Sequence, residues 1–322
     1  MTYEESLAWL YKTQQFGIKL GLENIERLLK SLGDPRERLR FFHVAGTNGK
    51  GSVCAMLDAM LRAAGLRTGL YTSPHLVDFR ERIRVDGRKI PPQAVAEGLT
   101  ILREISFGWD HSPTFFEIAT ALALWHFAVE RCDFVVLETG LGGTLDATNA
   151  VRPLVSVLTP IAIDHTRWLG STVAEIAGEK AGIIKPGVPV VSARQETEAV
   201  QVLVQRAKGV GSSLEFIDAL VEQGEIGLRG IHQRANAALA IAALQAARVM
   251  VPQVAMKRGL REVHWPGRFQ VVDERIVLDG CHNPHAARQL LVNWREAYGL
   301  EKATLIFGAL SDKDYFTMLK IL

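Results

Sequence analysis

Residues 43–56 read HVAGTNGKGSVCAM, and the segment GTNGKGS has the composition of a loop that binds phosphate. The common phosphate-loop pattern is G-x-x-x-x-G-K-[ST]. Aligned on Lys50, that pattern needs a glycine where Val44 stands and a hydroxyl residue where Gly51 stands, and the serine comes one place late, at Ser52. The local pattern therefore leaves both a tight turn and a phosphate loop open, and the surrounding elements must decide.

Apolar runs typical of strands alternate along the chain with runs of helical period. The continuous apolar segments DFVVLET and LVSVLTPI are typical of strands covered on both faces. Strands are predicted at 39–45, 67–72, 133–139 and 154–161, and helices at 53–65, 91–105, 115–131 and 232–250. This alternation predicts an α/β fold with a doubly wound, mostly parallel sheet.

The segment HWPGR at 264–268 breaks the pattern and is followed by a second, shorter α/β run. Strand-like FQVVDERIVLDG precedes a helix-like segment at 283–299 and a strand-like segment at 303–310. We therefore expect two domains, 1–264 and 265–322. The second is small for a domain, so we expect it to be an incomplete, Rossmann-like α/β unit.

Bulk composition excludes several classes of protein. A net charge of +2 without Lys/Arg runs argues against nucleic-acid binding, and FRERIRVDGRK (79–89) is interpreted as a solvated strand and turn. Three cysteines without C-x-x-C spacing fit a reducing compartment. No apolar run reaches membrane-spanning length, and the first residues do not resemble a signal peptide. We expect a cytoplasmic protein, with a monomer as the default.

Polar groups follow four predicted strands at the points where they end. GTNGKGS follows the first strand, and Ser73, Glu138 and His165 follow the next three. Ligands of open parallel sheets bind beyond the carboxyl ends of the strands, so these groups should meet at one rim. Lys50 and the loop amides suit phosphate, and the other three suit a hydrated cation such as Mg²⁺, although a histidine is unusual there. The rim predicts a nucleotide site.

A series of motifs resembles folylpolyglutamate synthase, including the bifunctional dihydrofolate synthase form, within the Mur ligase superfamily. The motifs are HVAGTNGKGS, YTSPHL, RERIRVDG, FFEIAT, ETGLGGTLDATN, DHTRWLGSTVAEIAGEKAGIIKPG, HQRANAALA, HWPGRFQ, LDGCHNPHA and FGALSDKD, in that order over about residues 16–314. The resemblance implies that 1–264 is a central ATP-binding domain and 265–322 a glutamate ligase domain. It also accounts for the late serine, because the family's phosphate loop reads GTNGKGS.

The same resemblance implies particular roles for matched residues. It implies Mg²⁺-associated roles for Ser73, Glu138 and His165, and a carbamate, N6-carboxylysine, at Lys180. A carbamylated lysine is chemically a carboxylate and can join a metal site. Catalytic roles are implied for Lys50, Lys180 and His282. The implied ATP-binding residues are Gly46, Thr47, Asn48, Gly49, Lys50, Gly51, Ser52, Asn236, Arg268 and Asp279.

A pterin-bearing substrate is implied at three further stretches. These are Lys19, Leu20, Gly21 and Leu22; Thr114, Phe115, Phe116 and Glu117; and Leu145, Asp146 and Ala147. Aromatic rings can stack on a flat pterin, and Asp146 can hydrogen-bond to it. At least one of Phe115 and Phe116 is expected to pack in the core instead, because they begin a strongly apolar helix.

The resemblance implies an ATP- and Mg²⁺-dependent ligase that adds L-glutamate to tetrahydrofolate, to dihydropteroate or to both, through an acyl phosphate. Three alternatives remain open from the residues alone. They are a Mur-type ligase with another substrate, a hydrolysing motor or switch NTPase, and an inactive or truncated folate- or nucleotide-binding protein. The expected incompleteness of 265–322 keeps the last alternative in view.

Overall fold

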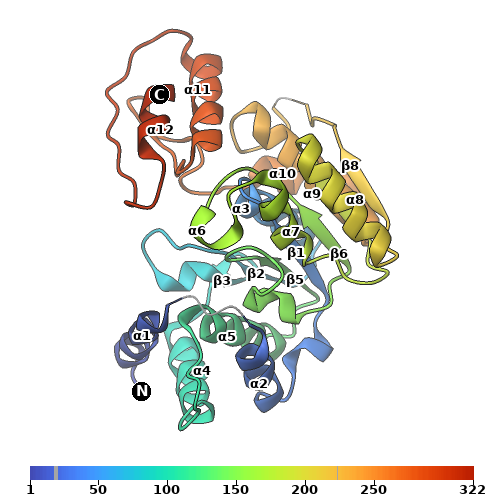
Figure 1. Cartoon of the computed structure of the whole chain (residues 1–322), viewed down its shortest axis with the longest axis vertical. Helices are drawn as coiled ribbons and strands as arrows, with labels where there is room; N and C mark the ends of the chain where they lie inside the picture. Colours follow the sequence, from blue (N-terminus) through green and yellow to red (C-terminus); the bar gives the residue numbers. More distant parts are fainter. Residues whose placement is uncertain (18–20, 223) are drawn as a thin grey trace.

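The computed structural model describes residues 1–17, 21–222 and 224–322. Its main feature is an eight-stranded sheet in the order β4-β3-β2-β5-β1-β6-β7-β8 (Figure 1). All neighbouring pairs from β2 to β8 are parallel, and β3 and β4 are antiparallel additions at one edge. The strands are β1 (Phe41–Ala45), β2 (Thr68–Tyr71), β3 (Ile83–Val85), β4 (Arg88–Lys89), β5 (Phe134–Glu138), β6 (Val155–Leu158), β7 (Val190–Ala193) and β8 (Leu214–Ile217).

The central strands are buried on both faces, as their continuous apolar sequences predict. Along β5, Phe134 and Val136 belong to one hydrophobic core, while Val135 and Leu137 belong to the core on the opposite face. Successive side chains of a strand point to opposite faces, so an all-apolar run is needed when helices cover both. The prediction of a doubly wound, mostly parallel sheet is confirmed.

Helices form a layer on each face of the sheet (Figure 1). One face carries α3 (Lys50–Ala63), α9 (Ile231–Ala246) and α10 (Gln253–Glu262). The other carries α1 (Tyr3–Lys12), α2 (Glu23–Ser31), α4 (Pro92–Ile105) and α5 (Phe115–Val129). The remaining helical elements of this part are α7 (Val173–Ala181) and α8 (Thr197–Gly209), the four-residue α6 (Thr166–Leu169), and the 3₁₀ turns η1 (Thr13–Phe16), η2 (Pro35–Arg38), η3 (Phe79–Arg82) and η4 (Ala147–Ala150).

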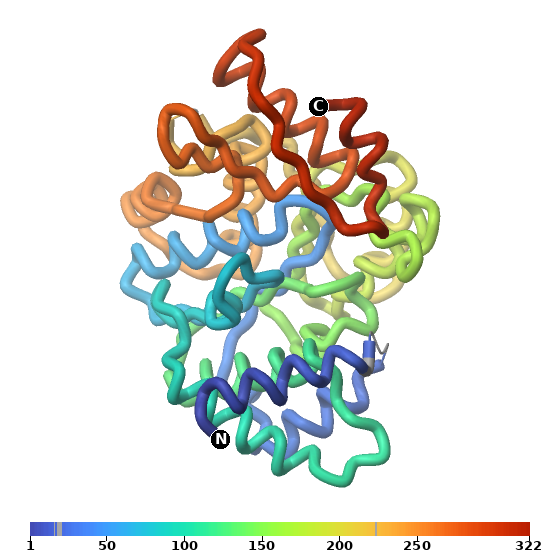
Figure 2. Tube along the Cα trace, turned by 90° about the vertical axis from the view of Figure 1, so that its left-hand side faces the viewer, coloured from blue at the N-terminus to red at the C-terminus, as the bar shows by residue number. Residues whose placement is uncertain are grey.

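The last part of the chain lies at one end of the molecule, opposite the end that carries α1 (Figure 2). It contains the antiparallel hairpin β9 (Gln270–Asp273) and β10 (Ile276–Leu278), and the helices α11 (Pro284–Tyr298) and α12 (Tyr315–Ile321). The strand predicted at 303–310 is wrong, because this segment has no strand structure. A strand needs a hydrogen-bonded neighbour, and none of the described strands lies beside it; Ile306 is accordingly 95% exposed.

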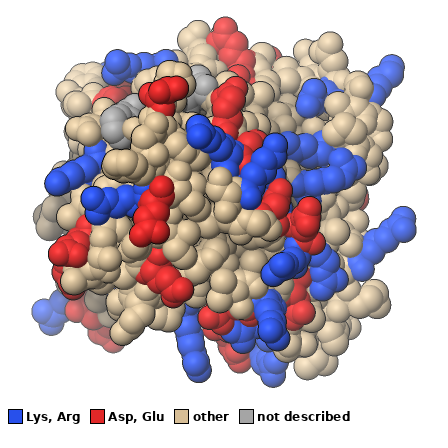
Figure 3. All heavy atoms as spheres, turned by 90° about the horizontal axis from the view of Figure 1, so that it is seen from below, with Lys and Arg blue, Asp and Glu red and all other residues tan. Residues whose placement is uncertain are grey.

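The surface carries both signs of charge. On the face seen in Figure 3, Lys and Arg side chains are interspersed with Asp and Glu, so that face has no broad single-sign patch. Among the described helices, none combines the length and the apolar character needed to cross a membrane.

Candidate active site

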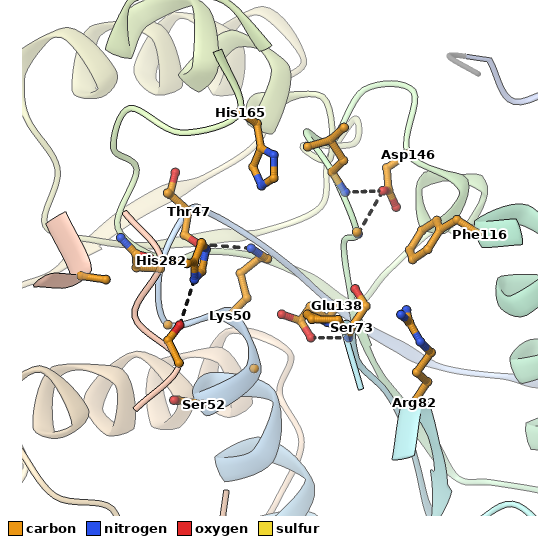
Figure 4. A pocket seen from close by; sticks show the side chains of 18 of the residues that line it. Thr47, Lys50, Ser52, Ser73, Arg82, Phe116, Glu138, Asp146, His165 and His282 are labelled. Carbon is orange, nitrogen blue, oxygen red and sulfur yellow. Dashed lines mark hydrogen bonds between the residues drawn. The ribbon is translucent and has the colours of Figure 1, made fainter. Parts of the chain in front are cut away.

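A cleft of about 580 Å³ lies at the carboxyl edge of the sheet (Figure 4). The phosphate-loop segment forms its floor, the segments after β2 and β5 form one wall, and the start of α11 faces them. Parallel strands present their carboxyl ends at one edge, which is why segments distant in sequence meet here. The structure therefore brings together most of the predicted nucleotide, metal and substrate residues.

The glycine loop makes the tight turn from β1 into α3 that a phosphate loop needs. Gly46 has φ 148°, and a Cβ there would lie 1.9 Å from Thr159 Oγ1. Gly49 has φ 90°, and a Cβ there would lie 2.8 Å from Asn236 Oδ1, so Asn236, a predicted ATP-binding residue, lies against the loop. Helix α3 begins at Lys50, three residues before the predicted start, so its unpaired first amides belong to the loop.

The structure also gives a physical reason for the late serine. A Cβ at Gly51 would lie 2.9 Å from Nε1 of Trp265, so any side chain there would require the indole to move. The hydroxyl therefore stands at Ser52, whose Oγ is buried without a hydrogen-bond partner among the described residues. An orphaned buried hydroxyl in a phosphate loop suits a ligand oxygen or a cation.

Two lysines converge on the carbonyl oxygen of Gly46. Lys50 Nζ donates to it at 3.1 Å and to the Thr47 carbonyl at 3.2 Å, and Lys180 Nζ donates to it at 2.8 Å. Lys180 is only 4% exposed. Burial, with the nearby charge of Lys50, lowers the pKa of Lys180 to about 7. A large share of this amine is therefore neutral near neutral pH.

The donor set beside the loop fits Mg²⁺. The backbone N–H of Ser73 donates to Glu138 Oε2 at 2.9 Å, and burial raises the pKa of Glu138 while Lys50 opposes that change. The described residues contain no cluster of three or more His, Cys, Asp or Glu suited to a metal. A cation here would therefore combine one carboxylate with hydroxyl and phosphate oxygens, which is the coordination that Mg²⁺ favours.

His165 lines the same cleft and has an unusual backbone conformation, with φ 51°. Burial lowers the pKa of His165, with Asp164 opposing and Lys313 reinforcing the shift. The imidazole is therefore favoured in its neutral form, which can ligate a metal. A non-glycine residue in the left-handed region near a functional rim is a costly placement.

The C-terminal segment contributes the opposite wall. Asp279 accepts hydrogen bonds from the backbone N–H groups of Phe269 (2.8 Å) and Cys281 (2.9 Å), so its carboxylate shapes the loop beside the cleft. Arg268 also lines the cleft, with Nη1 donating to the Gly267 carbonyl at 3.1 Å. The predicted ATP residues of this segment thus face the phosphate loop.

Asp164, which directly precedes His165 at the rim and for which no role was predicted, joins the two parts of the chain. Its carboxylate accepts hydrogen bonds from Lys313 Nζ (2.7 Å) and Asn283 Nδ2 (3.0 Å), and His282 Nε2 lies 3.4 Å away. These contacts hold the pKa of Asp164 well below its usual range despite its burial. His282 is thereby fixed beside the loop carrying His165, consistent with its predicted place at the cleft. The sequence signal for Asp164 was its position directly before His165, after the strand predicted at 154–161.

The residues predicted to bind pterin have structural roles as well as places in the cleft. Thr114 and Glu117 form a capping box at the start of α5, in which Glu117 Oε2 accepts from Thr114 N at 2.7 Å. Phe115 and Phe116 line the cleft and also pack against the core, and Phe115 stacks on Tyr11 with ring centroids 5.7 Å apart. Both rings therefore pack against the core, and both also face the cleft where a ligand could stack on them.

Asp146 is saturated by its own loop. Its carboxylate accepts from the backbone N–H groups of Gly140 (3.0 Å), Leu141 (2.9 Å) and Thr148 (3.0 Å), and from the Thr148 hydroxyl. These contacts favour a role in shaping the GLGGTLDATN segment. The other predicted residues Gly21, Leu145 and Ala147 line the cleft, Leu22 caps α2 instead, and Lys19 and Leu20 lie outside the described residues.

The interpretation of the segment 79–89 as solvated holds only in part. Lys89 is exposed, but Phe79, Ile83 and Val85 are buried, and Arg82 is only 9% exposed and lines the cleft. The alternating charges of RERIR gave no indication that Arg82 is buried. The one available signal was its position before a strand that pairs with β2, next to the rim.

Domain comparisons identify the class of protein. Residues 44–189 match the Mur ligase middle domain, and residues 267–320 match the glutamate ligase domain of Mur ligases. Together with the phosphate loop and the cleft, these matches define a Mur-type ATP-dependent ligase. The motor or switch NTPase alternative is thereby set aside.

More specific relatives identify the family. The chain is 37% identical to the dihydrofolate synthase/folylpolyglutamate synthase of Bacillus subtilis, over 99% of this chain and 82% of the relative. It is 42% identical to a probable bifunctional folylpolyglutamate synthase/dihydropteroate synthase of Haloferax volcanii, of which it spans only 41%. The chain belongs to the folylpolyglutamate synthase/dihydrofolate synthase family.

Solved structures with similar folds support this family assignment. An FPGS–AMPPCP–folate complex superposes with a TM-score of 0.91 at 33% identity, covering 99% of this chain and 86% of that one. Escherichia coli FolC in complex with DHPP and ADP superposes with a TM-score of 0.87 at 36% identity, covering 98% and 80%.

Replacing Lys50 should nearly abolish turnover. In Lys50→Ala the cleft loses the mobile cation of the phosphate loop, and removing one such electrostatic contact costs on the order of 100-fold or more in turnover. Phosphate release at saturating MgATP measures the effect, and Lys257→Ala, an exposed lysine paired with Glu225, is the matched control. Near-normal turnover of Lys50→Ala would refute the assignment of this loop.

Proposed function

We propose that this chain joins L-glutamate to tetrahydrofolate, to dihydropteroate or to both, at the expense of ATP. The observation that carries the proposal is the single cleft in which a phosphate loop, a buried carboxylate and an aromatic wall lie together. Relatives described as acting on folate or binding DHPP support the acceptor class. A non-catalytic binding protein would not need two lysines at the Gly46 carbonyl, of which Lys180 is buried.

The reaction begins when the acceptor carboxylate attacks the γ-phosphorus of ATP, which gives ADP and an acyl phosphate. The amine of L-glutamate then attacks the acyl carbon, phosphate leaves with the bridging oxygen, and the amide forms as the nitrogen loses a proton. A free carboxylate is a poor acyl donor, so phosphorylation supplies the leaving group. The share of the protein is mainly positioning and neutralisation of charge.

Particular residues of the chain serve these steps. Lys50 and the first amides of α3 hold phosphate oxygens, Asn236 supports the loop, and Arg268 and Asp279 close the nucleotide end of the cleft. Ser73, Glu138 and His165, with Ser52, would hold Mg²⁺, which neutralises phosphate charge when bound. His282 faces the phosphate end, where Asp164 positions it.

A carbamate on Lys180 resolves the crowding of two lysines. An ammonium at Lys180 would repel both Lys50 and a nearby cation, whereas a carbamate would pair with them. The lowered pKa supplies the neutral amine that CO₂ requires. The carbamate nitrogen keeps one N–H, which can still donate to the Gly46 carbonyl.

We also propose a division into a central domain, 1–264, and a glutamate ligase domain, 265–322, and a cytoplasmic location. The domain matches at 44–189 and 267–320 support the division. The location is supported by three free cysteines, of which Cys54 and Cys132 are buried.

Product mass tests the proposed function directly. The chain is incubated with MgATP and L-glutamate, with dihydropteroate and with tetrahydrofolate in separate reactions, and the products are weighed by mass spectrometry. We expect the mass of the acceptor to rise by one glutamyl residue, with phosphate release that depends on glutamate. Retained ATP binding without a mass gain on either acceptor would contradict the ligase assignment.

Lys180 should carry a carbamate whose amount depends on pH. Because the pKa is about 7, the neutral amine fraction rises as pH increases through about 7, and so does the carbamate at fixed dissolved CO₂. Carbonyl ¹³C NMR under ¹³CO₂ measures it, with Lys185→Ala as a control that keeps the signal. Lys180→Ala should lose the signal and most turnover, and added short carboxylic acids should restore part of the rate. A signal that persists in Lys180→Ala would disprove the modification.

A further inference from the structure

The Arg82 guanidinium is a buried cation that faces the substrate side of the cleft. Arg82 ends η3, is 9% exposed and lines the cavity. In Figure 4 its side chain extends toward the space between Ser73 and Phe116. It thus lies between the phosphate end of the cleft, marked by Glu138, and the aromatic wall at the start of α5.

Arg82 forms no ion pair in the described part of the chain, and Glu138, the carboxylate across the cleft, interacts with it only at longer range. Its guanidinium makes one hydrogen bond there, from Nε to His75 Nδ1 at 2.8 Å, and no described carboxylate lies within ion-pairing distance. By contrast, Arg80 in the same turn is paired with Asp78 at 2.7 Å, and Arg36 is paired with Asp34 and Glu26. Buried charges are normally paired because desolvation is costly, so Arg82 lacks an anion that something else must supply.

The neighbours of Arg82 fix its orientation, and among the described residues none accepts a hydrogen bond from its two Nη groups. The Nδ1 atom of His75 accepts from Nε of Arg82 at 2.8 Å and holds that edge of the guanidinium in place. The Phe115 ring centroid lies 5.3 Å from the guanidinium carbon. With Nε engaged, the two Nη groups present the planar pair of donors that matches a carboxylate.

We propose that Arg82 binds the acceptor carboxylate that ATP phosphorylates. This inference rests on the proposed function and assigns a binding residue for its acceptor. A pterin on the aromatic wall, with its acid reaching toward Glu138, would place that carboxylate at Arg82. The contact would neutralise a charge that otherwise repels the γ-phosphate, and would hold the attacking oxygen in line.

Equilibrium binding without turnover tests the assignment. Dihydropteroate and the same pterin lacking the carboxyl group are titrated against the wild type, Arg82→Met and Arg82→Lys, with ATP affinity measured alongside. The wild type should prefer the carboxylate by about tenfold or more, the value for a charge-assisted hydrogen bond. Arg82→Met should lose that preference while keeping its ATP affinity, and Arg82→Lys should recover part of it. Arg80→Met, in the same turn but paired with Asp78, should behave as the wild type.

Other results would overturn the proposal in distinguishable ways. An unchanged preference in Arg82→Met refutes the assignment alone, and a loss of ATP affinity with the preference intact would place Arg82 on phosphate. In turnover, Arg82→Met should lower kcat/KM with both acceptors. A loss confined to tetrahydrofolate would place Arg82 on its non-reacting carboxylate and refute the assignment. If the wild type binds neither pterin, the proposed function itself fails.

Discussion

Two lysine side chains share one backbone carbonyl, and the rest of the site depends on how that crowding is resolved. The Gly46 carbonyl can accept from both Lys50 and Lys180 only because the turn from β1 into α3 points it inward. Burial, and after it the nearby charge of Lys50, lowers the pKa of Lys180, so two ammonium groups are disfavoured at this carbonyl. The proposed carbamate on Lys180 would turn the repulsion into attraction and leave Lys50 as the cation of the loop.

The buried carboxylate of Asp164 connects the cleft to the last part of the chain. Asp164 follows β6 at the carboxyl edge of the sheet, yet its carboxylate is bound by Lys313, Asn283 and His282 from the last part of the chain. The antiparallel hairpin and α11 are therefore tied to the rim by a charged contact.

Much of this arrangement could be predicted because its signals are local. Strands covered on both faces need unbroken apolar runs, and the strand-to-helix glycine loop fixes where phosphate binds. Features that depend on long-range contacts could not be predicted. The burial of Arg82 depends on packing beside the cleft, and the segment 303–310 lacks a strand because none of the described strands pairs with it. The capping box of Thr114 and Glu117 was missed although T-x-x-E before an apolar run is its sequence signature, whereas the hydrogen bonds that occupy Asp146 required the structure. The reason for Gly51 required the position of Trp265.

The central claim is that ATP activates the acceptor carboxylate by phosphorylating it, and oxygen transfer tests this most directly. The acceptor is prepared with ¹⁸O in both carboxylate oxygens and turned over with unlabelled MgATP and L-glutamate. Attack of the carboxylate on the γ-phosphorus predicts one ¹⁸O in each phosphate released and one retained in the new amide. Phosphate without ¹⁸O, released at the rate of amide formation, would contradict the account.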